Sequence, residues 1–275
     1  HDRHRPLCAQ RPQQLHDLVL VPQVEVGEGL VEQAGALVVE AKMPLAASIK
    51  GPSGEGPEVV GWLDPAEPPT TLFGHAADAD ILVLVEMGQA PASRLDDLLP
   101  DYPPRALIGR TRGPGDHARS IIASRYPILQ RLPDRNDGLS AVGATVQTPI
   151  GPINVLGVHL TRPWPYQYQW GQISQVMALT ERRKAAPDHP VIAAGDFNSV
   201  STARIGRQIQ ADMGLIPAPG WPATWPSQAP AFAGITIDQV YRSPDLALIT
   251  RRLGQPTGSD HRPVVTEFTR AQSPR

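Results

Sequence analysis

Two short polar motifs, each beside an apolar run, carry side chains that could do chemistry. Gly195-Asp196-Phe197-Asn198 follows the apolar run 191–194, and Ser259-Asp260-His261-Arg262-Pro263-Val264 lies near the C-terminus. Each motif places a carboxylate beside a second polar group on a tight turn. Carboxylate oxygens bind hard divalent cations, and an imidazole can exchange a proton near neutral pH. Either motif alone also fits an ordinary surface turn, but together they predict two walls of one metal and phosphate site.

Three more polar side chains stand where strands are expected to end or to be interrupted. Glu86 closes the apolar run 81–85, His159 ends a second run, and Asp238 interrupts an apolar alternation, where it lowers stability unless it is paired. Metal-assisted hydrolysis of a phosphoester needs oxygen ligands, deprotonated water and cationic groups near the leaving oxygen. These residues could supply all three, although Glu86 also fits a solvated strand end and His159 a structural role.

The elements that must position these residues follow a readable pattern between residues 81 and 269. Apolar runs indicate strands buried on both faces, and Ile173, Val176 and Leu179, with Trp170 added, indicate the buried side of a helix. The predicted helices span 92–99, 167–184 and 202–213. The predicted strands span 81–86, 119–124, 128–132, 141–147, 153–160, 191–194, 236–241, 247–250 and 264–268. Helices interleaved with strands and hairpins predict a two-sheet α/β sandwich rather than a purely parallel sheet.

Residues 1–75 have a different composition. The stretch 1–16 is rich in Arg, His, Pro and Gln, and the stretch 51–71 is rich in Pro, Gly and Glu. Only 17–26 and 36–41 resemble strands. We therefore predict an atypical, poorly packed N-terminal segment over residues 1–75, followed by the main domain over residues 76–270.

The composition limits the class of protein. The 275 residues, of which 41% are hydrophobic and 19% charged, fit a globular protein, and the net charge of −2 argues against a broadly basic nucleic-acid-binding surface. Cys8 is the only cysteine, which rules out an intrachain disulfide and a thiolate zinc cage. No apolar stretch approaches the ~20 residues that cross a bilayer. Because the chain starts at His1, an export or anchor segment could precede it, and the localisation stays open.

Six segments of the sequence resemble the endonuclease/exonuclease/phosphatase superfamily, in the order in which that family carries them. They are Asp80-Ile81-Leu82-Val83-Leu84-Val85-Glu86, Ile122-Ala123-Ser124-Arg125-Tyr126-Pro127-Ile128, Val158-His159-Leu160, Gly195-Asp196-Phe197-Asn198, Ile237-Asp238 and Ser259-Asp260-His261-Arg262-Pro263-Val264. The resemblance covers residues 78–269. It implies a DNase I-like fold, which is a four-layered α/β sandwich with two mixed β-sheets flanked by helices, and it identifies residues 76–270 as the superfamily domain.

The resemblance also implies which residues handle the metal and the water. Glu86 would bind Mg²⁺, for which Mn²⁺ is an alternative, and Asp260 would complete the metal shell or position it. Asp196 would orient or deprotonate the attacking water. These are expectations carried over from matching positions of the family motifs, and each of them requires the fold to bring the three carboxylates to one place.

The remaining candidate residues would act on the phosphate. Asn198 would hold the scissile phosphate, and His159 would contact it and help to neutralise the developing charge. Asp238 would pair with His261 and raise its pKa, so that an imidazolium faces the phosphate. The transition state gathers charge on the non-bridging oxygens, which a cation and imidazolium groups stabilise electrostatically.

One residue of the family pattern is missing. Family members open with a strand that ends in an Asn, which binds phosphate or metal, whereas the first Asn of this chain is Asn136. Residues 1–75 also lack the usual apolar opening strand. We hypothesise that this segment is a wrong start, a frame error or a divergent replacement. The chain would then lack one strand of a sheet and one phosphate ligand, and its activity would be impaired.

The sequence thus predicts a Mg²⁺-dependent hydrolase of phosphoester bonds, either a phosphodiesterase or nuclease or a phosphatase. Its substrate would be a nucleic acid or a small phosphorylated molecule, and DNA, RNA, inositol phosphates and phospholipid headgroups all stay open. The aromatic insert 162–170 could stack a base, meet a lipid surface or form a rigid loop. We expect a monomer without an obligate protein partner. The alternative is a catalytically impaired member that binds a phosphorylated ligand or a partner.

Overall fold

The computed structural model of the chain describes residues 35–41, 49–50, 57–58, 79–87, 95–103, 105–106, 119–133, 138–163, 169–254 and 259–271. The chain divides into two compact units, His1–Glu32 and Gln33–Arg275, and all the described residues belong to the second. The strand-like run 17–26 and most of the aromatic insert lie outside the described residues.

The strands and helices of the second unit have the following bounds. The strands are β1 (Gly35–Ala41), β2 (Ile49–Lys50), β3 (Pro57–Glu58), β4 (Ile81–Met87), β5 (Arg105–Ala106), β6 (Arg119–Ser124), β7 (Ile128–Arg131), β8 (Ser140–Thr148), β9 (Gly151–His159), β10 (Val191–Asp196), β11 (Ile216–Pro217), β12 (Asp238–Arg242), β13 (Leu246–Leu253) and β14 (Val264–Arg270). The helices are α3 (Leu95–Leu98), α4 (Gln169–Ala185), α5 (Arg204–Met213) and the 3-10 turn η2 (Ala231–Ala233).

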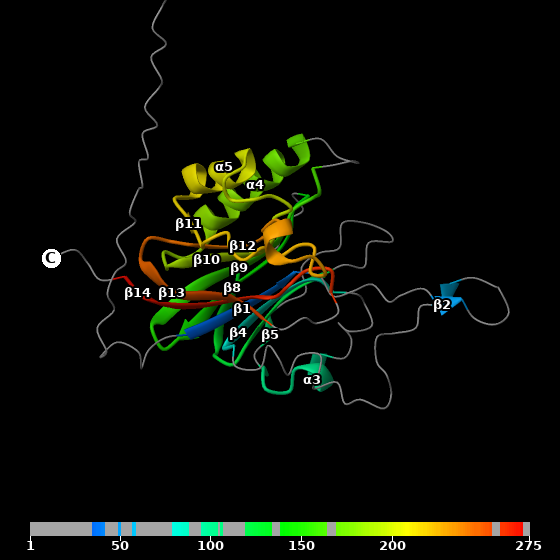
Figure 1. The fold of residues 1–275 in the computed structure, drawn as a ribbon. Helices are drawn as coiled ribbons and strands as arrows, with labels where there is room; N and C mark the ends of the chain where they lie inside the picture. Colours follow the sequence, from blue (N-terminus) through cyan, green and yellow to red (C-terminus); the bar gives the residue numbers. More distant parts are fainter. Residues whose placement is uncertain are drawn as a thin grey trace, which may run out of the picture. The chain divides into compact units, whose positions relative to one another are not determined.

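Two six-stranded sheets form the centre of this unit (Figure 1). The first has the order β13-β14-β1-β4-β6-β5, and the second has the order β11-β12-β10-β9-β8-β7. Both sheets are mixed, because β1 pairs parallel with β4 and antiparallel with β14, while β10 pairs parallel with β9 and antiparallel with β12.

The expectation that the chain lacks one strand of a sheet is wrong. Strand β1 lies inside the first sheet, with Leu37 opposite Ile81 of β4 and Val38 opposite Val265 of β14. The run 36–41 is strand-like in sequence. Because it is short and its surroundings are rich in Pro and Gly, the sequence did not predict that it pairs within the sheet. Strand β1 ends in Val39-Glu40-Ala41 and therefore carries no Asn at its end.

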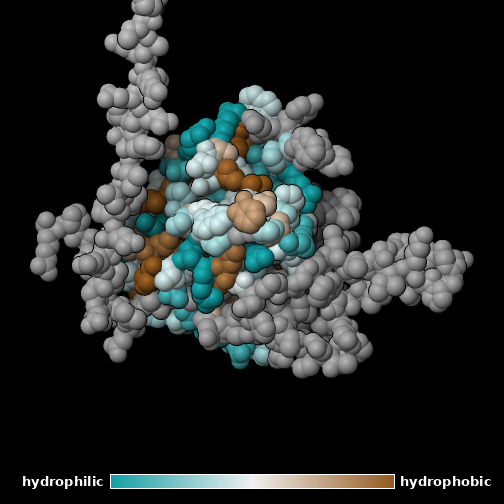
Figure 2. Space-filling model, in the orientation of Figure 1, coloured by the Kyte–Doolittle hydropathy of each residue, from teal (hydrophilic) through white to brown (hydrophobic). Residues whose placement is uncertain are grey.

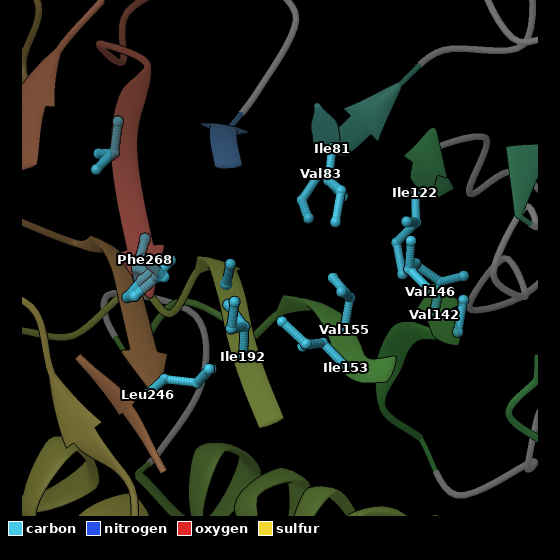
Figure 3. Close-up of a cluster of buried hydrophobic side chains, with 14 of the residues drawn as sticks. Ile81, Val83, Ile122, Val142, Val146, Ile153, Val155, Ile192, Leu246 and Phe268 are labelled. Atoms are coloured by element: carbon cyan, nitrogen blue, oxygen red, sulfur yellow. The ribbon is translucent and has the colours of Figure 1, made fainter. Parts of the chain in front are cut away.

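The main core lies between the two sheets. In β4 the side chains of Ile81, Val83 and Val85 enter this core, whereas Leu82 and Leu84 belong to the core on the other face of the same sheet. Figure 3 shows Ile81, Val83 and Ile122 facing residues of the second sheet, which include Val142, Val146, Ile153, Val155 and Ile192. The continuous apolar run of β4 is therefore buried on both faces, as its sequence predicts.

Helices cover the outer faces of the two sheets. Helices α4 and α5 pack on the second sheet, where Val176, Leu179 and Ile209 meet Leu156 and Val158 of β9 (Figure 1). The residues around α3 cover the first sheet, where Leu99 and Tyr102 join its outer-face cluster. These layers form the predicted α/β sandwich.

The predicted helical stripe is correct except at its first residue. Ile173, Val176 and Leu179 are buried, but Trp170 is 73% exposed. Trp170 is the second residue of α4, and its side chain is directed to solvent. Figure 2 shows hydrophobic residues in small groups between hydrophilic ones on the face it displays. No described helix is long and apolar enough to cross a membrane.

Candidate active site

The register of the second sheet places three candidate residues in one row. Asp196, the last residue of β10, lies opposite His159 at the end of β9 and opposite Asp238 at the start of β12. Directly opposite residues on adjacent strands have their side chains about 5 Å apart on the same face of the sheet. Pairing between strands thus gathers side chains that are 37 and 42 residues from Asp196 in the sequence.

Gly195 allows this row to form. Its φ of +140° lies in a region that side chains rarely adopt, and a Cβ there would lie 2.0 Å from the backbone oxygen of Val158. Only glycine fits such a close approach. The chain can therefore turn directly after β10, and the carboxylate of Asp196 comes to lie with one oxygen 3.9 Å from Nε2 of His159.

Asn198 closes a turn on the same carboxylate. Its φ is +47°, and its backbone N–H donates to Oδ1 of Asp196 at 2.8 Å, which is an Asx-type turn. Its side-chain nitrogen donates to Leu160 O at 2.8 Å and to Oδ2 of Asp196 at 3.2 Å. Asn198 therefore ties the end of β9 to the end of β10, and contact with a phosphate requires one of these acceptors to be exchanged.

His261 and Asp238 form a buried pair. Nδ1 of His261 lies 3.0 Å from each carboxylate oxygen of Asp238, which is the expected pairing. A carboxylate at Nδ1 fixes the tautomer and leaves Nε2 as the working atom. Burial lowers the pKa of His261, but the hydrogen bond and charge of Asp238 outweigh it, assisted by the charges of Asp196 and Asp260, so the pKa is raised.

The carboxylate of Asp196 is buried, with 3% of the residue exposed. Burial and the nearby negative charge of Asp238 raise its pKa from 3.8 to about 7, against the opposing influence of His159, His261 and the backbone N–H of Asn198. Two carboxylates and two imidazoles therefore form one electrostatically linked group at the ends of three strands.

Comparison with known proteins identifies the family of the chain. Residues 63–261 match the sequence model of the Endonuclease/Exonuclease/phosphatase family. The chain belongs to this family. Its members are hydrolases of phosphoester bonds, and the membership supports this activity for the chain. No curated protein matches the chain in sequence.

Solved structures show the same fold at low identity. An endonuclease/exonuclease/phosphatase from Beutenbergia cavernae is 19% identical with a TM-score of 0.61, over 87% of this chain and 72% of that chain. A mannosyl-6-phosphatase from Bacteroides thetaiotaomicron is 16% identical with a TM-score of 0.60, over 86% and 99%. A 2′,3′-cyclic phosphatase in complex with adenosine-2′,3′-vanadate is 14% identical with a TM-score of 0.58, over 87% and 96%. The predicted DNase I-like fold is confirmed.

The donor set fits a divalent cation of the kind that the family uses. Asp196, Asp238 and His261 each offer a ligand atom, and these atoms lie within 4.8 Å of one another. Carboxylates suit Mg²⁺ and Mn²⁺, and an imidazole suits several other divalent metals. The predicted ligand Glu86 lies in β4, but its side chain is outside the described part of the chain. Asp260 does not belong to the 4.8 Å group of described residues.

Thr224 is a supporting residue that the sequence did not reveal. Its buried hydroxyl accepts the backbone N–H groups of Ile237 and Asp238 at 3.2 and 3.3 Å, and its carbonyl accepts the N–H of Arg262 at 2.9 Å. It thereby links the start of β12 to the segment that carries His261. Thr224 lies in a segment rich in Pro and Gly, and its partners are backbone atoms, so no motif indicates this role.

Proposed function

We propose that the chain is a divalent-metal-dependent hydrolase in which water attacks a phosphoester held by Asn198 and His groups. The observation that carries the proposal is the row of His159, Asp196 and Asp238, joined to His261 through the buried Asp238 pair. In this group Asp196 can accept a proton, and His159 and His261 can carry positive charge toward a single phosphate.

His261 and Asp238 act as a unit. Asp238 accepts the Nδ1 proton of His261, which orients the ring and stabilises its charged form. The imidazolium then faces the negative charge that gathers on the phosphate oxygens in the transition state. In a buried site this electrostatic stabilisation is large, because the surrounding groups are already oriented and water does not compete.

Asp196 positions the attacking water and accepts its proton. His159, 3.9 Å from Asp196, contacts the phosphate and limits the repulsion between the incoming water oxygen and the anionic substrate. Asn198 holds a phosphate oxygen after one of its two side-chain hydrogen bonds is exchanged. Proton transfer by a positioned side chain contributes roughly 10²–10⁴-fold to the rate.

By the family pattern, the divalent cation, Mg²⁺ or alternatively Mn²⁺, would be held by Glu86 and Asp260. Asp238 and His261 lie close enough together to bind a metal, but in this proposal they are hydrogen-bonded to each other instead. When bound, it polarises the phosphoryl oxygens and neutralises part of the developing charge. The substrate class follows the range of the structural neighbours, one of which is described as a mannosyl-6-phosphatase and one as a 2′,3′-cyclic phosphatase. The substrate panel contains small phosphomonoesters together with RNA and single- and double-stranded DNA, which the sequence leaves open.

A second candidate function is a family member that binds a phosphorylated ligand without turnover. The observation that favours it is strand β1, which ends in Val39-Glu40-Ala41 and carries no Asn. The retained Asp196, Asp238, His159 and His261 favour turnover instead. The two functions differ in a measurable way, because a binding module retains metal affinity but releases no product.

The test is hydrolysis of bis-(p-nitrophenyl) phosphate with Mg²⁺, with Mn²⁺ and with EDTA. We expect metal-dependent turnover that falls about 10²–10⁴-fold in His261→Ala. The matched control is His189→Ala, because His189 lies in the turn before β10, at the end of that strand opposite to Asp196. Equal activity of His261→Ala and wild type would refute the role of His261. Metal binding by calorimetry without any turnover would establish the binding module.

A further inference from the structure

Helix α4 carries two buried glutamines on the side that faces the candidate site. Gln172 is 2% exposed and Gln175 is 4% exposed, and they lie one helical turn apart. Burying an amide without partners costs free energy, so buried Gln side chains are normally hydrogen-bonded. The partners of these two glutamines are backbone atoms of the loops that carry the site residues.

Gln172 bridges the two loops. Its side-chain nitrogen lies 2.8 Å from Thr161 O, 3.3 Å from Phe197 O and 3.3 Å from Asn198 O. Thr161 follows β9, two residues after His159, while Phe197 and Asn198 directly follow Asp196. One amide group therefore donates to both chain segments that leave the row of site residues.

Gln175 binds the other backbone hydrogen-bonding group of Thr161. Its Oε1 accepts the backbone N–H of Thr161 at 2.9 Å, and its Nε2 donates to Gly138 O at 3.1 Å. The peptide groups of Thr161 are thus fixed at both ends, since the N–H is bound by Gln175 and the C=O by Gln172. Gly138 lies just before β8, the other neighbour of β9, so the clamp reaches a third strand.

We propose that Gln172 and Gln175 form an amide clamp that positions His159 against Asp196 and Asn198. The inference rests on the proposed function, because the rate depends on the distances between His159, Asp196 and Asn198 only if they act on a single phosphate. A displacement of 1 Å in a catalytic group can lower the rate by about 10²-fold. The clamp residues are positioning residues, since none of their atoms needs to touch the substrate.

Another buried polar residue of α4, Arg182, provides the contrast. Arg182 donates to Ala141 O at 3.0 Å and to Leu139 O at 3.3 Å, so it anchors the same helix on β8. It is 7% exposed, and these two acceptors lie at or just before the start of β8, not in the segments that follow β9 and β10. If the glutamines only anchored the helix, their loss would have the same consequences as the loss of Arg182.

The two glutamines play different hydrogen-bonding roles toward Thr161, which gives a sharp test. Gln172 acts there only as a donor, so Gln172→Glu, which sets a carboxylate oxygen against carbonyl oxygens, should lower kcat more than Gln172→Leu. Gln175→Glu keeps the acceptor for the N–H of Thr161 but loses the donor to Gly138 O, so only amide exchange at Thr161 should stay closer to wild type than in Gln175→Leu. The expected loss for Gln172→Leu is about 10- to 100-fold in kcat, with KM changed less than about 3-fold. Arg182→Met should lose stability and keep its kcat at a temperature where every variant is folded.

Backbone amide exchange tests the clamp without turnover. Gln175→Leu should speed exchange at Thr161, whose N–H loses its acceptor. Gln172→Leu should speed it at Asn198, whose N–H keeps Asp196 as acceptor but whose loop loses the hydrogen bonds to its carbonyl groups. Arg182→Met should change neither. Unchanged exchange in the glutamine variants, or faster exchange with wild-type kcat, would overturn the proposal. A wild type without turnover would refute the proposed function, and exchange would then decide on the clamp by itself.

Discussion

The buried carboxylate of Asp196 should destabilise the protein at neutral pH, and Asp196→Asn should remove this cost. The pKa rises from 3.8 to about 7, a difference of about 3 pH units. At about 1.36 kcal/mol per unit, the ionised carboxylate costs about 4 kcal/mol above pH 7. The Asn side chain keeps one acceptor for the N–H of Asn198 and loses the other hydrogen bond, which costs about 1 kcal/mol. The net gain in the free energy of unfolding is therefore about 2–3 kcal/mol.

The sign of the pH dependence follows from which state binds the proton. Unfolded Asp196 loses its proton near pH 3.8, whereas folded Asp196 keeps it until about pH 7. Between these values the folded state binds more protons, so stability falls as the pH rises. The raised pKa of His261 also makes stability fall, but only above its unfolded value of 6.5. The contribution of Asp196 is therefore separable between pH 4.5 and 6.

Urea denaturation in EDTA, followed by Trp fluorescence at pH 4.5, 5.5, 6.5 and 7.5, measures this contribution. The curves of wild type and Asp196→Asn should nearly coincide at the lowest pH and diverge steadily above it. Asp245→Asn is the control, because it makes the same change of side chain at an exposed position. An Asp196→Asn protein less stable than wild type at pH 7.5, or a difference that stays constant with pH, would refute the reasoning. In Mg²⁺ the same variant should lose turnover.

Two substitutions test the structure that supports the site, and chelation tests the metal requirement. Gly195→Ala should cost more than about 3 kcal/mol in urea unfolding, because its Cβ would meet the oxygen of Val158 at 2.0 Å; Gly220→Ala, with no atom within 4 Å, should cost less than about 1 kcal/mol. Tyr241→Phe should leave stability unchanged or raise it by about 1 kcal/mol, because this buried hydroxyl has no hydrogen-bond partner among the described residues. A larger loss would reveal a partner. Chelation by EDTA should abolish hydrolysis, and Mg²⁺ or Mn²⁺ should restore it; turnover in EDTA would contradict the metal requirement.

The strands that the sequence predicts best are those whose burial is decided locally. The run 81–85 is apolar at every position, and both faces of β4 are buried, so the pattern needs no knowledge of its neighbours. Strand β1 shows the opposite case. It pairs with β4 and also with β14, which lies more than 220 residues later, and both pairings are needed to place 35–41 inside the sheet. Local composition placed it in a poorly packed segment for this reason.

The sequence predicted which residues belong to the site, but it did not predict that three of them lie opposite one another in one sheet. The apolar runs predict His159 and Asp196 at strand ends, whereas they predict Asp238 inside a strand over 236–241, and it stands instead at the start of β12. That they become neighbours depends on the register of β9, β10 and β12, and a shift by one residue would turn a side chain to the other face of the sheet. The motifs therefore predict which residues are candidates for one site, and the register of the sheet brings them together.

The residues that support the site escape sequence reasoning for a different reason. Gln172, Gln175 and Thr224 each bind peptide groups, and every residue except Pro presents the same N–H and C=O. No side-chain type at the partner position marks such a contact, whereas the pairing of Asp238 with His261 has a recognisable residue at both ends. A polar residue on the buried face of a helix is the signal that remains, because burial obliges it to find a partner. In α4 buried polar residues stand at 172, 175, 180 and 182, next to the apolar stripe, and the partners of the first two lie in the loops that carry the site residues.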